Sequence, residues 1–233
     1  MAWLITGASG FIGSRVVQKL PKTEVVLHIH GEQEKDKKQA EKFRASGFSV
    51  FEGDLTKKET LQNIPTGLSG IVHTANIAGG NDARLLQANP GTTRLVGQAA
   101  KQHKVGTVVY LSSVAVYGET PVEGAAENFR PSPNTLYGES KLAAEEILKL
   151  AVEKRDISSA VILRLNSVYG PGQEKGFIYH HISNITNRGY FQIDGMGNQV
   201  RQPVFVDDVV DIIAKFIKLI KNPLSGFEIF NVA

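Results

Sequence analysis

The chain has 233 residues, of which 42% are apolar and 21% charged, and its formal net charge is +3. This balance is typical of one large folded domain, or of a domain with a small lobe, and excludes a low-complexity chain. The chain has no cysteine, which excludes disulfides, thiolate metal sites and a cysteine nucleophile. Its basic residues are spread out, so we expect no nucleic-acid partner. No apolar run reaches the roughly 18 residues of a membrane-spanning helix, and we expect a soluble, cytoplasmic protein without a signal peptide.

A glycine-rich turn follows the first apolar run, at residues 2–5. Residues 6–15 read Thr-Gly-Ala-Ser-Gly-Phe-Ile-Gly-Ser-Arg and open a helical pattern that extends to Leu20. A strand, a glycine turn and a helix start in this order predict a cradle for a dinucleotide phosphate, because the backbone can approach the ligand and the helix start offers free N–H groups. A plain strand-to-helix turn is the alternative. The candidate cofactor-binding residues here are Gly7, Ser9, Gly10, Phe11, Ile12 and Gly13.

Apolar strands and helical patterns alternate through the next 150 residues. Nearly continuous apolar strands that alternate with helices predict a parallel sheet covered on both faces, so the expected fold is a doubly wound Rossmann-type α/β sheet of about seven strands. We expect strands at residues 2–5, 24–30, 48–51, 71–75, 107–111 and 160–165, and helices at 11–20, within 31–44, and at 56–64, 89–104 and 140–155.

The alternation breaks after residues 170–172, which read Gly-Pro-Gly. We expect a helix at 177–188, a small strand at 190–193, a turn at 194–198, a helix capped by Asp207 or Asp208 that runs to about 221, and a last strand at 227–230. The predicted domains are a dinucleotide-binding domain at 1–165, completed by 204–233, and a partial substrate lobe at 166–203. Since the chain stops at Ala233, we expect this lobe to be short.

Two short segments could carry chemistry. Tyr137 and Lys141 lie four residues apart at a predicted helix start, so their side chains share one face. A phenol is a poor base at neutral pH, but a nearby ammonium favours the phenolate and lowers its pKa. Ser112 and Ser113 end the fifth predicted strand, where ligands of doubly wound sheets bind, and a serine there can donate to a carbonyl or alkoxide oxygen. A surface pair and a turn serine are the alternatives.

Taken in order, these motifs resemble the extended short-chain dehydrogenase/reductase family, in its nucleotide-sugar epimerase/dehydratase group. The matching segments are residues 6–13, 53–55, 73–75, 89–92, 112–118, 137–141 and 169–171. The resemblance implies an NAD(P)-dependent enzyme that forms a homodimer. It implies that Ser113 is the catalytic hydroxyl, Tyr137 the base and Lys141 its partner, the last two also contacting the cofactor. It further implies adenine contacts at Asp54 and Leu55, phosphate contacts at Thr74 and Ala75, a bracing role for Asn89, and substrate contacts at Ser112, Ser113, Ser167 and Arg201.

Several positions depart from the family pattern. Val114 and Ala115 stand where dehydratases of this group usually have an Asp-Glu pair, which disfavours 4,6-dehydration. Ser167 stands where the family usually has an asparagine that contacts the substrate diphosphate, which weakens the prediction of a nucleotide sugar. The second strand ends at Ile29 and His30 without the usual acid that binds the ribose of NAD. The cofactor prediction is therefore NAD or NADP with a slight lean to NADP, whose phosphate His30 could meet with Arg15 or Lys35, although Glu32 could supply a ribose contact.

The functional prediction is hydride transfer at a secondary alcohol or ketone, most simply by a nucleotide-sugar 4-epimerase or 4-keto reductase. The alternatives are an NADP-dependent reductase of a non-nucleotide carbonyl compound and a non-catalytic dinucleotide-binding module. His180 and His181 have no third ligand in view, so no metal site is predicted.

Overall fold

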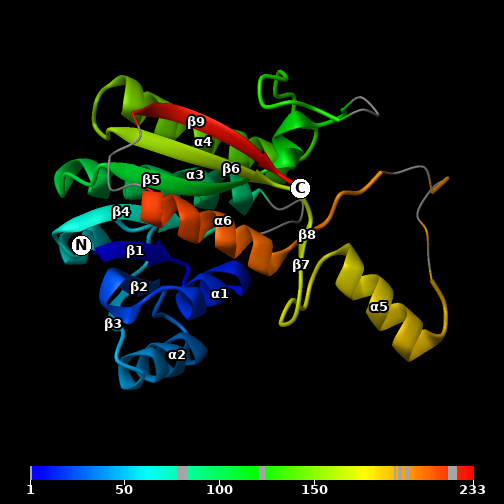
Figure 1. Cartoon of the computed structure of the whole chain (residues 1–233), viewed down its shortest axis with the longest axis horizontal. Helices are drawn as coiled ribbons and strands as arrows, with labels where there is room; N and C mark the ends of the chain where they lie inside the picture. The colour runs from blue at the N-terminus through cyan, green and yellow to red at the C-terminus, as the bar shows by residue number, and fades with distance from the viewer. Residues whose placement is uncertain are drawn as a thin grey trace.

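The computed structural model describes residues 2–77, 83–120, 124–191, 193, 196–197, 200–219 and 225–233. Seven strands form one sheet in the order β3-β2-β1-β4-β5-β6-β9, and all neighbouring pairs run parallel (Figure 1). This confirms the predicted doubly wound sheet. The strands are β1 Ala2–Thr6, β2 Val25–Ile29, β3 Ser49–Glu52, β4 Leu68–His73, β5 Thr107–Ser113, β6 Ser159–Leu165 and β9 Gly226–Val232.

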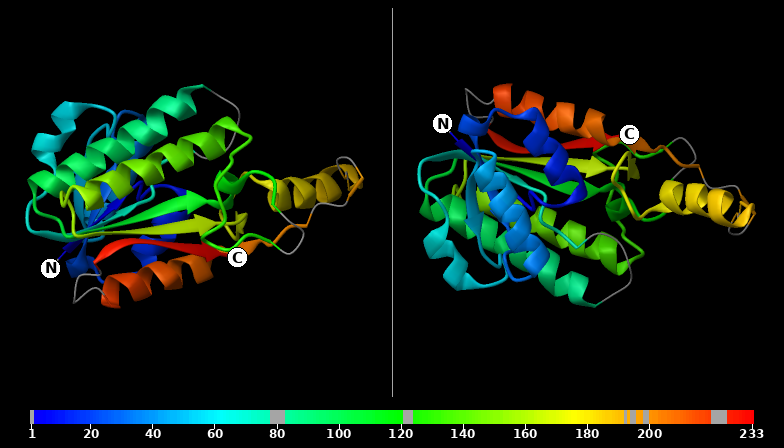
Figure 2. Two further views of the ribbon diagram at one scale, coloured as in Figure 1. Left: turned by 90° about the horizontal axis from the view of Figure 1, so that it is seen from above. Right: turned by 90° about the horizontal axis from the view of Figure 1, so that it is seen from below.

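Helices cover both faces of the sheet. Figure 2 shows α3 and α4 on one face and α6 on the other, and α1 packs beside α6. A two-stranded ladder of β7 and β8 and the helix α5 lie outside these layers, and α5 projects from the body of the molecule (Figure 1). The helices are α1 Phe11–Lys19, α2 Glu34–Ala45, α3 Arg84–Gln102, α4 Leu136–Glu153, α5 Phe177–Arg188 and α6 Val206–Leu219, with 3₁₀ turns η1 Lys22–Glu24, η2 Lys58–Asn63 and η3 Val114–Tyr117; the short strands are β7 Val168–Tyr169 and β8 Val204–Phe205.

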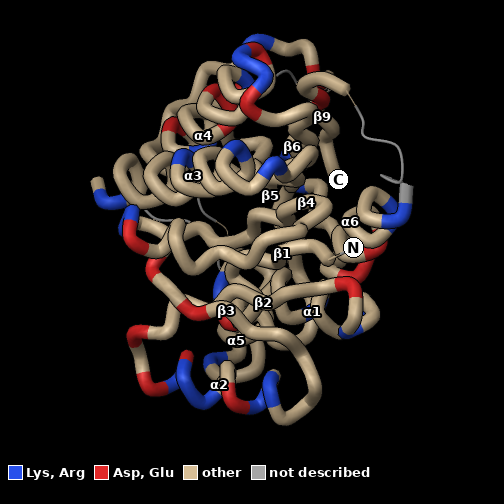
Figure 3. Tube along the Cα trace, turned by 90° about the vertical axis from the view of Figure 1, so that its left-hand side faces the viewer, with Lys and Arg blue, Asp and Glu red and all other residues tan. Residues whose placement is uncertain are grey.

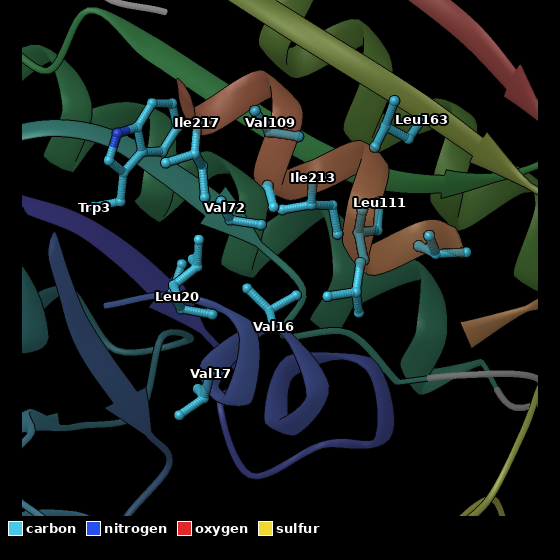
Figure 4. Packing of buried hydrophobic residues seen from close by; sticks show 14 of the residues in the cluster. Trp3, Val16, Val17, Leu20, Val72, Val109, Leu111, Leu163, Ile213 and Ile217 are labelled. Atoms are coloured by element: carbon cyan, nitrogen blue, oxygen red, sulfur yellow. The ribbon is translucent and has the colours of Figure 1, made fainter. Parts of the chain in front are cut away.

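The period of two along each strand divides the core into two clusters. In β1, Trp3 and Ile5 join the cluster beneath α1 and α6, whereas Leu4 joins the cluster beneath α3 and α4. Both faces of the strand are apolar because both are covered, as expected for a parallel sheet. Figure 4 shows the first cluster, in which Val16, Val17 and Leu20 meet Ile213 and Ile217 of α6 and Val72, Val109, Leu111 and Leu163 of the sheet.

The strand order sets where a ligand can bind. The chain builds outward from β1 to β3 and then returns to place β4 on the other side of β1. The connections leaving the carboxyl ends of β1 and β4 therefore turn to opposite sides, and a crevice opens between them. The glycine turn after β1 and the residues after β4 line this crevice, with the end of β5 one strand further along.

Several predicted boundaries are wrong in informative ways. Helix α3 begins at Arg84, five residues before its predicted start, and continues through Pro90, which has no N–H to donate to the carbonyl of Leu86. Helix α4 begins at Leu136, so Tyr137 lies inside its first turn, and Thr135 Oγ1 caps it by accepting from Gly138 N at 3.0 Å.

The segment after α5 also differs from its prediction. Residues 190, 191 and 193 of the predicted strand are not in a strand. Residue 192 and the predicted turn positions 194, 195 and 198 lie outside the described residues. Helix α6 begins at Val206, directly after β8, so Asp207 and Asp208 lie in its first turn and do not cap it. They still favour the helix, because acidic groups there face the positive end of the helix dipole.

Surface charge is mixed. Along α2, Lys and Arg alternate with Asp and Glu (Figure 3), which agrees with the solvated helix expected at residues 31–44. Among the described residues, no helix has the length and apolar character needed to cross a membrane.

Gly13→Ala tests the close packing of the glycine turn. An added Cβ would lie 2.2 Å from the Gly7 carbonyl oxygen, so backbone atoms would have to move. We expect the free energy of unfolding to fall by about 1–3 kcal/mol in urea denaturation. Gly91→Ala on α3 is the matched control, because its Cβ meets nothing within 4 Å. Helix propensity should make that variant about 0.5–1 kcal/mol more stable. Equal destabilisation of both variants would contradict this interpretation.

Candidate active site

A cavity of about 1160 Å³ opens at the carboxyl ends of the central strands. The glycine turn and α1 contribute Phe11 and Ile12, and the residues after β4 contribute Thr74 and Asn76. The far wall comes from the end of β5, the start of α4 and the 166–178 and 200–202 segments. Of the predicted site residues, the cavity brings together Phe11, Ile12, Thr74, Ser112, Ser113, Tyr137, Lys141, Ser167 and Arg201.

The glycine turn after β1 packs closely against the backbone of the residues after β4. Gly7 has φ +67° and lies so close to the residue after β4 that a Cβ would be 2.9 Å from the Ala75 Cα. Gly10 N donates to the Gly7 carbonyl at 2.9 Å, which closes the turn at the start of α1. The turn therefore leaves room above the free N–H groups of α1, and the residues present fit the pyrophosphate of a dinucleotide. A shallower hollow of about 430 Å³ beside it is lined by Ser9, Gly10, Phe11, Ser14, Arg15, Gln18, Pro171 and Gly172.

His28, a residue that the sequence pattern did not single out, anchors this turn. Its Nδ1 accepts a hydrogen bond from Gly7 N at 3.3 Å, and its Nε2 lies 2.7 Å from the Gly53 carbonyl oxygen. Since the backbone N–H can only donate and the carbonyl can only accept, the neutral ring carries its proton on Nε2. Burial lowers the pKa of His28 to about 4, which keeps this arrangement neutral.

Ser113, Tyr137 and Lys141 meet at one side of the cavity. The Lys141 ammonium donates to the Leu111 carbonyl at 2.7 Å and lies 5.8 Å from the centre of the Tyr137 ring. Ser113 accepts from Ala115 N at 3.2 Å, so its side chain caps η3, and the same hydroxyl acts on the pKa of the nearby Tyr137 phenol. The helical spacing of four residues thus places the tyrosine and the lysine on one face, as predicted.

The protonation of this trio differs from expectation. Burial raises the pKa of Tyr137, and the hydrogen bond with Ser113 only partly opposes that rise. Burial lowers the pKa of Lys141 to about 7, although the nearby Glu145 carboxylate favours its charged form. Among the protein groups, burial therefore outweighs the effects that lower the Tyr137 pKa, contrary to the expected fall.

Ser112 lines the cavity, but its hydroxyl belongs to a buried polar network. Its hydroxyl donates to Glu145 Oε1 at 2.5 Å, and Arg164 donates to the same carboxylate from Nε at 3.1 Å and from Nη2 at 2.6 Å. Ser112 and Arg164 are direct partners in the β5–β6 register and face α4 together. The prediction that Ser112 contacts substrate is therefore not supported, since its hydroxyl is committed to Glu145.

The same network reaches the last strand. Asn231, the register partner of Arg164 in β9, accepts from the Tyr117 hydroxyl at 2.8 Å and donates to the Ala125 carbonyl at 2.8 Å. The Arg164 guanidinium lies 4.7 Å from the centre of the Tyr117 ring. Sequence reasoning missed Glu145, Arg164 and Asn231, because charged or amide side chains become a set only once the strand register is known.

A second buried row supports the residues after β4. The Thr6 hydroxyl oxygen accepts from the N–H groups of Thr74 and Ala75, so its hydrogen points to His73 Nδ1 at 2.8 Å. His73 Nε2 then donates to Thr93 Oγ1 at 3.2 Å. Burial lowers the pKa of His73 to about 3, which keeps the ring neutral.

Asn89 supports the loop that leaves β4, as the resemblance implied. It accepts from Ile77 N at 2.9 Å and donates to the Ile77 carbonyl and to Ser140 Oγ. Its side chain thus links α3, the loop and the first turns of α4.

The tip of β2 carries a polar cluster. His30 Nε2 lies 3.8 Å from Asp54 Oδ1, and Lys57 Nζ lies 2.6 Å from Glu32 Oε1 and 3.5 Å from Asp54 Oδ2. Burial would raise the pKa of Asp54, but hydrogen bonds from Thr56 outweigh it and hold the pKa below its usual value. His30, Glu32 and Asp54 bring metal-ligand atom types within 4.8 Å of one another, but the Lys57 ammonium already lies beside both carboxylates. We assign no metal to this cluster.

Arg15 and Leu55 were both considered as cofactor contacts at this end. Arg15 donates to the Pro171 carbonyl at 2.8 Å and lies 3.9 Å from Asp207 Oδ1, so it does not join His30 at the tip of β2. Leu55 is buried and packs in the core beneath α3.

The substrate side of the cavity is cationic. Lys141, Lys175 and Arg201 line it, and the Arg201 guanidinium lies 5.7 Å from the centre of the Phe177 ring. No aspartate or glutamate is among the described residues that line it. Ser167 is held in the wall by its backbone, since its N–H donates to Asn166 Oδ1 and its carbonyl accepts from Val204 N.

A doubly wound sheet with a glycine cradle at its switch point and a Ser, Tyr and Lys trio beyond it defines a dinucleotide-binding domain of the short-chain dehydrogenase type. The chain belongs to the NAD dependent epimerase/dehydratase family, whose model matches residues 3–233.

Individual relatives agree with the family. The chain is 28% identical to N-acetyl-alpha-D-glucosaminyl-diphospho-ditrans,octacis-undecaprenol 4-epimerase of Escherichia coli O157:H7, over 98% of this chain and 66% of the relative. It is 29% identical to UDP-glucose 4-epimerase of Mycolicibacterium smegmatis, over 100% of this chain and 77% of the relative. A mutant UDP-glucuronic acid 4-epimerase from Bacillus cereus, solved with UDP-4-deoxy-4-fluoro-glucuronic acid and NAD, superposes with a TM-score of 0.85 at 25% identity, covering 100% of this chain and 77% of that one. The chain thus spans about two thirds to three quarters of the length of these relatives.

Glu145→Gln tests the buried ion pair. It leaves the Arg164 guanidinium buried without a countercharge, so we expect the free energy of unfolding to fall by about 3–5 kcal/mol. Glu34→Gln is the matched control, because Glu34 pairs with Lys37 at 3.0 Å on the exposed face of α2 and its loss should cost less than about 1 kcal/mol. Urea denaturation of both variants measures the difference, and similar losses in the two would refute the assignment.

Acid should weaken the fold through its two neutral histidines. The pKa values of His28 and His73 are lowered to about 4 and about 3 by burial, whereas an unfolded histidine titrates near 6.5. Between these limits the unfolded chain binds more protons, so stability falls as pH drops below about 6.5. Each histidine should contribute roughly 2 kcal/mol of the loss between pH 7.5 and pH 5.

Urea denaturation at the two pH values measures this loss. His28→Asn should remove about half of the pH-dependent difference, whatever its effect on overall stability. His180→Gln, on the exposed surface of α5, should leave the difference unchanged. An unaltered pH dependence in His28→Asn would contradict the assignment of His28 as a buried neutral group.

Proposed function

We propose that the protein is an NAD-dependent nucleotide-sugar epimerase that acts at the 4-position of the sugar. The observation that carries this proposal is the meeting of Ser113, Tyr137 and Lys141 in a cavity whose other wall is the glycine cradle. When bound, NAD⁺ supplies the capacity to take a hydride from the substrate carbon and to return it.

The chain's own residues supply the proton chemistry. Tyr137 accepts the proton of the substrate hydroxyl at its phenolic oxygen, and the Ser113 hydroxyl donates to the oxygen that becomes a carbonyl. Tyr137 needs its pKa lowered to act as a base. The Lys141 ammonium, 5.8 Å from the phenol ring, and the positive charge that the cofactor carries when oxidised both favour the phenolate. Epimerisation requires the ketone to turn its opposite face to the cofactor before the hydride returns, and Tyr137 then returns the proton to the substrate oxygen.

The geometry supports NAD over NADP. A ribose phosphate at the tip of β2 would meet the carboxylates Glu32 and Asp54, and repulsion opposes its binding. Arg15, considered as a partner for that phosphate, binds Pro171 instead. The structural relative from Bacillus cereus was solved with NAD. We therefore propose NAD and withdraw the lean to NADP.

The charge of the cavity supports an anionic substrate. Lys175 and Arg201 face it, and the described lining contains no carboxylate side chain, so a diphosphate would be attracted. Val114 and Ala115 of η3 line the cavity where an acid would be needed to protonate a leaving hydroxyl. This argues for epimerisation over 4,6-dehydration. The homodimer implied by the resemblance stays a prediction, which the exposed Leu86 and Leu150 of α3 and α4 support.

Tyr137→Phe tests the catalytic assignment. Removing the phenolic oxygen should lower kcat by about 10²–10⁴-fold, because that oxygen is the proposed site of proton transfer. Binding of NAD⁺ should change little, as measured by calorimetric titration. Turnover is assayed by interconversion of UDP-glucose and UDP-galactose and of their glucuronic acid counterparts.

Tyr169→Phe is the matched control, since Tyr169 also lines the cavity but belongs to β7. Near wild-type turnover in Tyr137→Phe would refute the mechanism. Turnover of plain ketones with NADPH, in place of nucleotide sugars, would favour the alternative reductase.

A further inference from the structure

Asn76 has a buried polar group that the mechanism above does not use. It follows β4 and lines the cavity, and its Oδ1 accepts a hydrogen bond from the Tyr110 hydroxyl at 3.2 Å. Its Nδ2 is shielded from solvent yet has no hydrogen-bond partner among the described residues. A buried amide N–H without an acceptor is costly, so the arrangement indicates that an acceptor arrives with a ligand.

The orientation of the Asn76 carboxamide is set by Tyr110. Tyr110 is fully buried in β5 and stacks on His73, its register partner in β4, with 5.5 Å between ring centres. Burial raises the pKa of Tyr110 well above its usual value, so its hydroxyl stays protonated and remains a donor. The donor holds Asn76 Oδ1 toward the sheet, which turns the Nδ2 hydrogens away from Tyr110.

The position of Asn76 selects which part of a dinucleotide it can reach. Strand β4 lies between β1, which leads into the glycine cradle, and β5, which leads to Ser113. The Lys141 ammonium lies 4.9 Å from the centre of the Tyr110 ring, on the same side as the catalytic trio. A dinucleotide whose pyrophosphate lies at the cradle must pass Asn76 to reach Tyr137. The polar cluster at the tip of β2 marks the opposite, adenosine end.

We propose that Asn76 is a cofactor-binding residue whose Nδ2 donates a hydrogen bond to an oxygen of the ribose that carries the nicotinamide in NAD⁺. The proposal rests on the proposed use of NAD. It adds to the cofactor-binding residues a side chain that the glycine turn and the Tyr-x-x-x-Lys spacing do not predict. It also gives the buried Tyr110 hydroxyl a role as a positioning group.

Titration with three nucleotides locates the contact. NAD⁺ and ADP-ribose contain the second ribose, whereas ADP ends at the pyrophosphate. In Asn76→Ala we expect the Kd for NAD⁺ and for ADP-ribose to rise about three- to tenfold, as for the loss of one hydrogen bond, and the Kd for ADP to stay within about twofold. Asn76→Ser should give a similar pattern, since its shorter side chain removes the donor from the same place.

Two further variants separate binding from folding. Tyr110→Phe keeps the ring but releases the carboxamide, so it should weaken binding of NAD⁺ less than Asn76→Ala does while also sparing ADP. Asn187→Ala is the matched control, because Asn187 lies exposed on α5 and its amide donates only to Ser183 Oγ at 3.0 Å. It should leave all three Kd values unchanged.

The outcomes are distinct. Equal weakening of all three nucleotides would show that Asn76 acts through the glycine cradle and would overturn the proposal. Unchanged binding of NAD⁺ by Asn76→Ala and Asn76→Ser would overturn it as well. If the wild-type protein binds ADP but not NAD⁺, the proposed function fails and this inference fails with it. Selective loss of NAD⁺ and ADP-ribose binding in the presence of full ADP binding supports it.

Discussion

The buried ion pair between Glu145 and Arg164 is the interaction that holds the geometry of the proposed catalytic site together. Glu145 lies on α4, four residues after Lys141, and Arg164 lies on β6, so the pair connects the helix of the catalytic trio to the sheet. Ser112 and Tyr117 join it from both ends of the turn that carries Ser113. Separating such charges in a buried setting is strongly unfavourable, so the pair resists sliding of α4 against the sheet.

A second constraint is the neutrality of the groups beneath the cofactor cradle. His28 and His73 sit at the carboxyl ends of β2 and β4, and each has both ring nitrogens engaged with protein atoms. Charging either ring would place an unsolvated cation under the turn and leave one nitrogen facing a donor. The same low-polarity setting lowers the pKa of Lys141 and raises that of Tyr137. In the proposed mechanism, the positive charge of the oxidised cofactor would oppose this rise in the Tyr137 pKa.

Much of the fold and part of the site follow from local patterns. Trp3, Leu4 and Ile5 read as a strand buried on both sides because each residue is apolar. Gly7 and Gly13 indicate a tight turn because only glycine fits where backbone atoms come this close. Tyr137 and Lys141 share a helix face because their spacing matches the helical repeat. Each of these signals lies within a few residues, so no knowledge of distant contacts is needed.

Other predictions failed because distant residues decided them. Arg15 was considered as a partner of His30, but it donates a hydrogen bond to the carbonyl of Pro171, which lies far along the chain. Ser112 and Ser113 are adjacent and chemically alike, and only the register with Arg164 sends one to Glu145 and leaves the other beside Tyr137. The phenol pKa was expected to fall with Lys141 nearby, yet burial of the phenol raises it.

The sequence by itself determined the class of fold, the glycine turn after the first strand and the shared helix face of Tyr137 and Lys141, since strand periodicity, glycine spacing and helical spacing are local properties of a chain. Only the tertiary structure decided which polar side chains form hydrogen bonds within the protein and which face the cavity. Hydrogen bonding and burial depend on groups that arrive from other strands, as with Tyr110 and Asn76, or Arg164 and Asn231. These pairings arise from register and topology, which no short stretch of sequence contains.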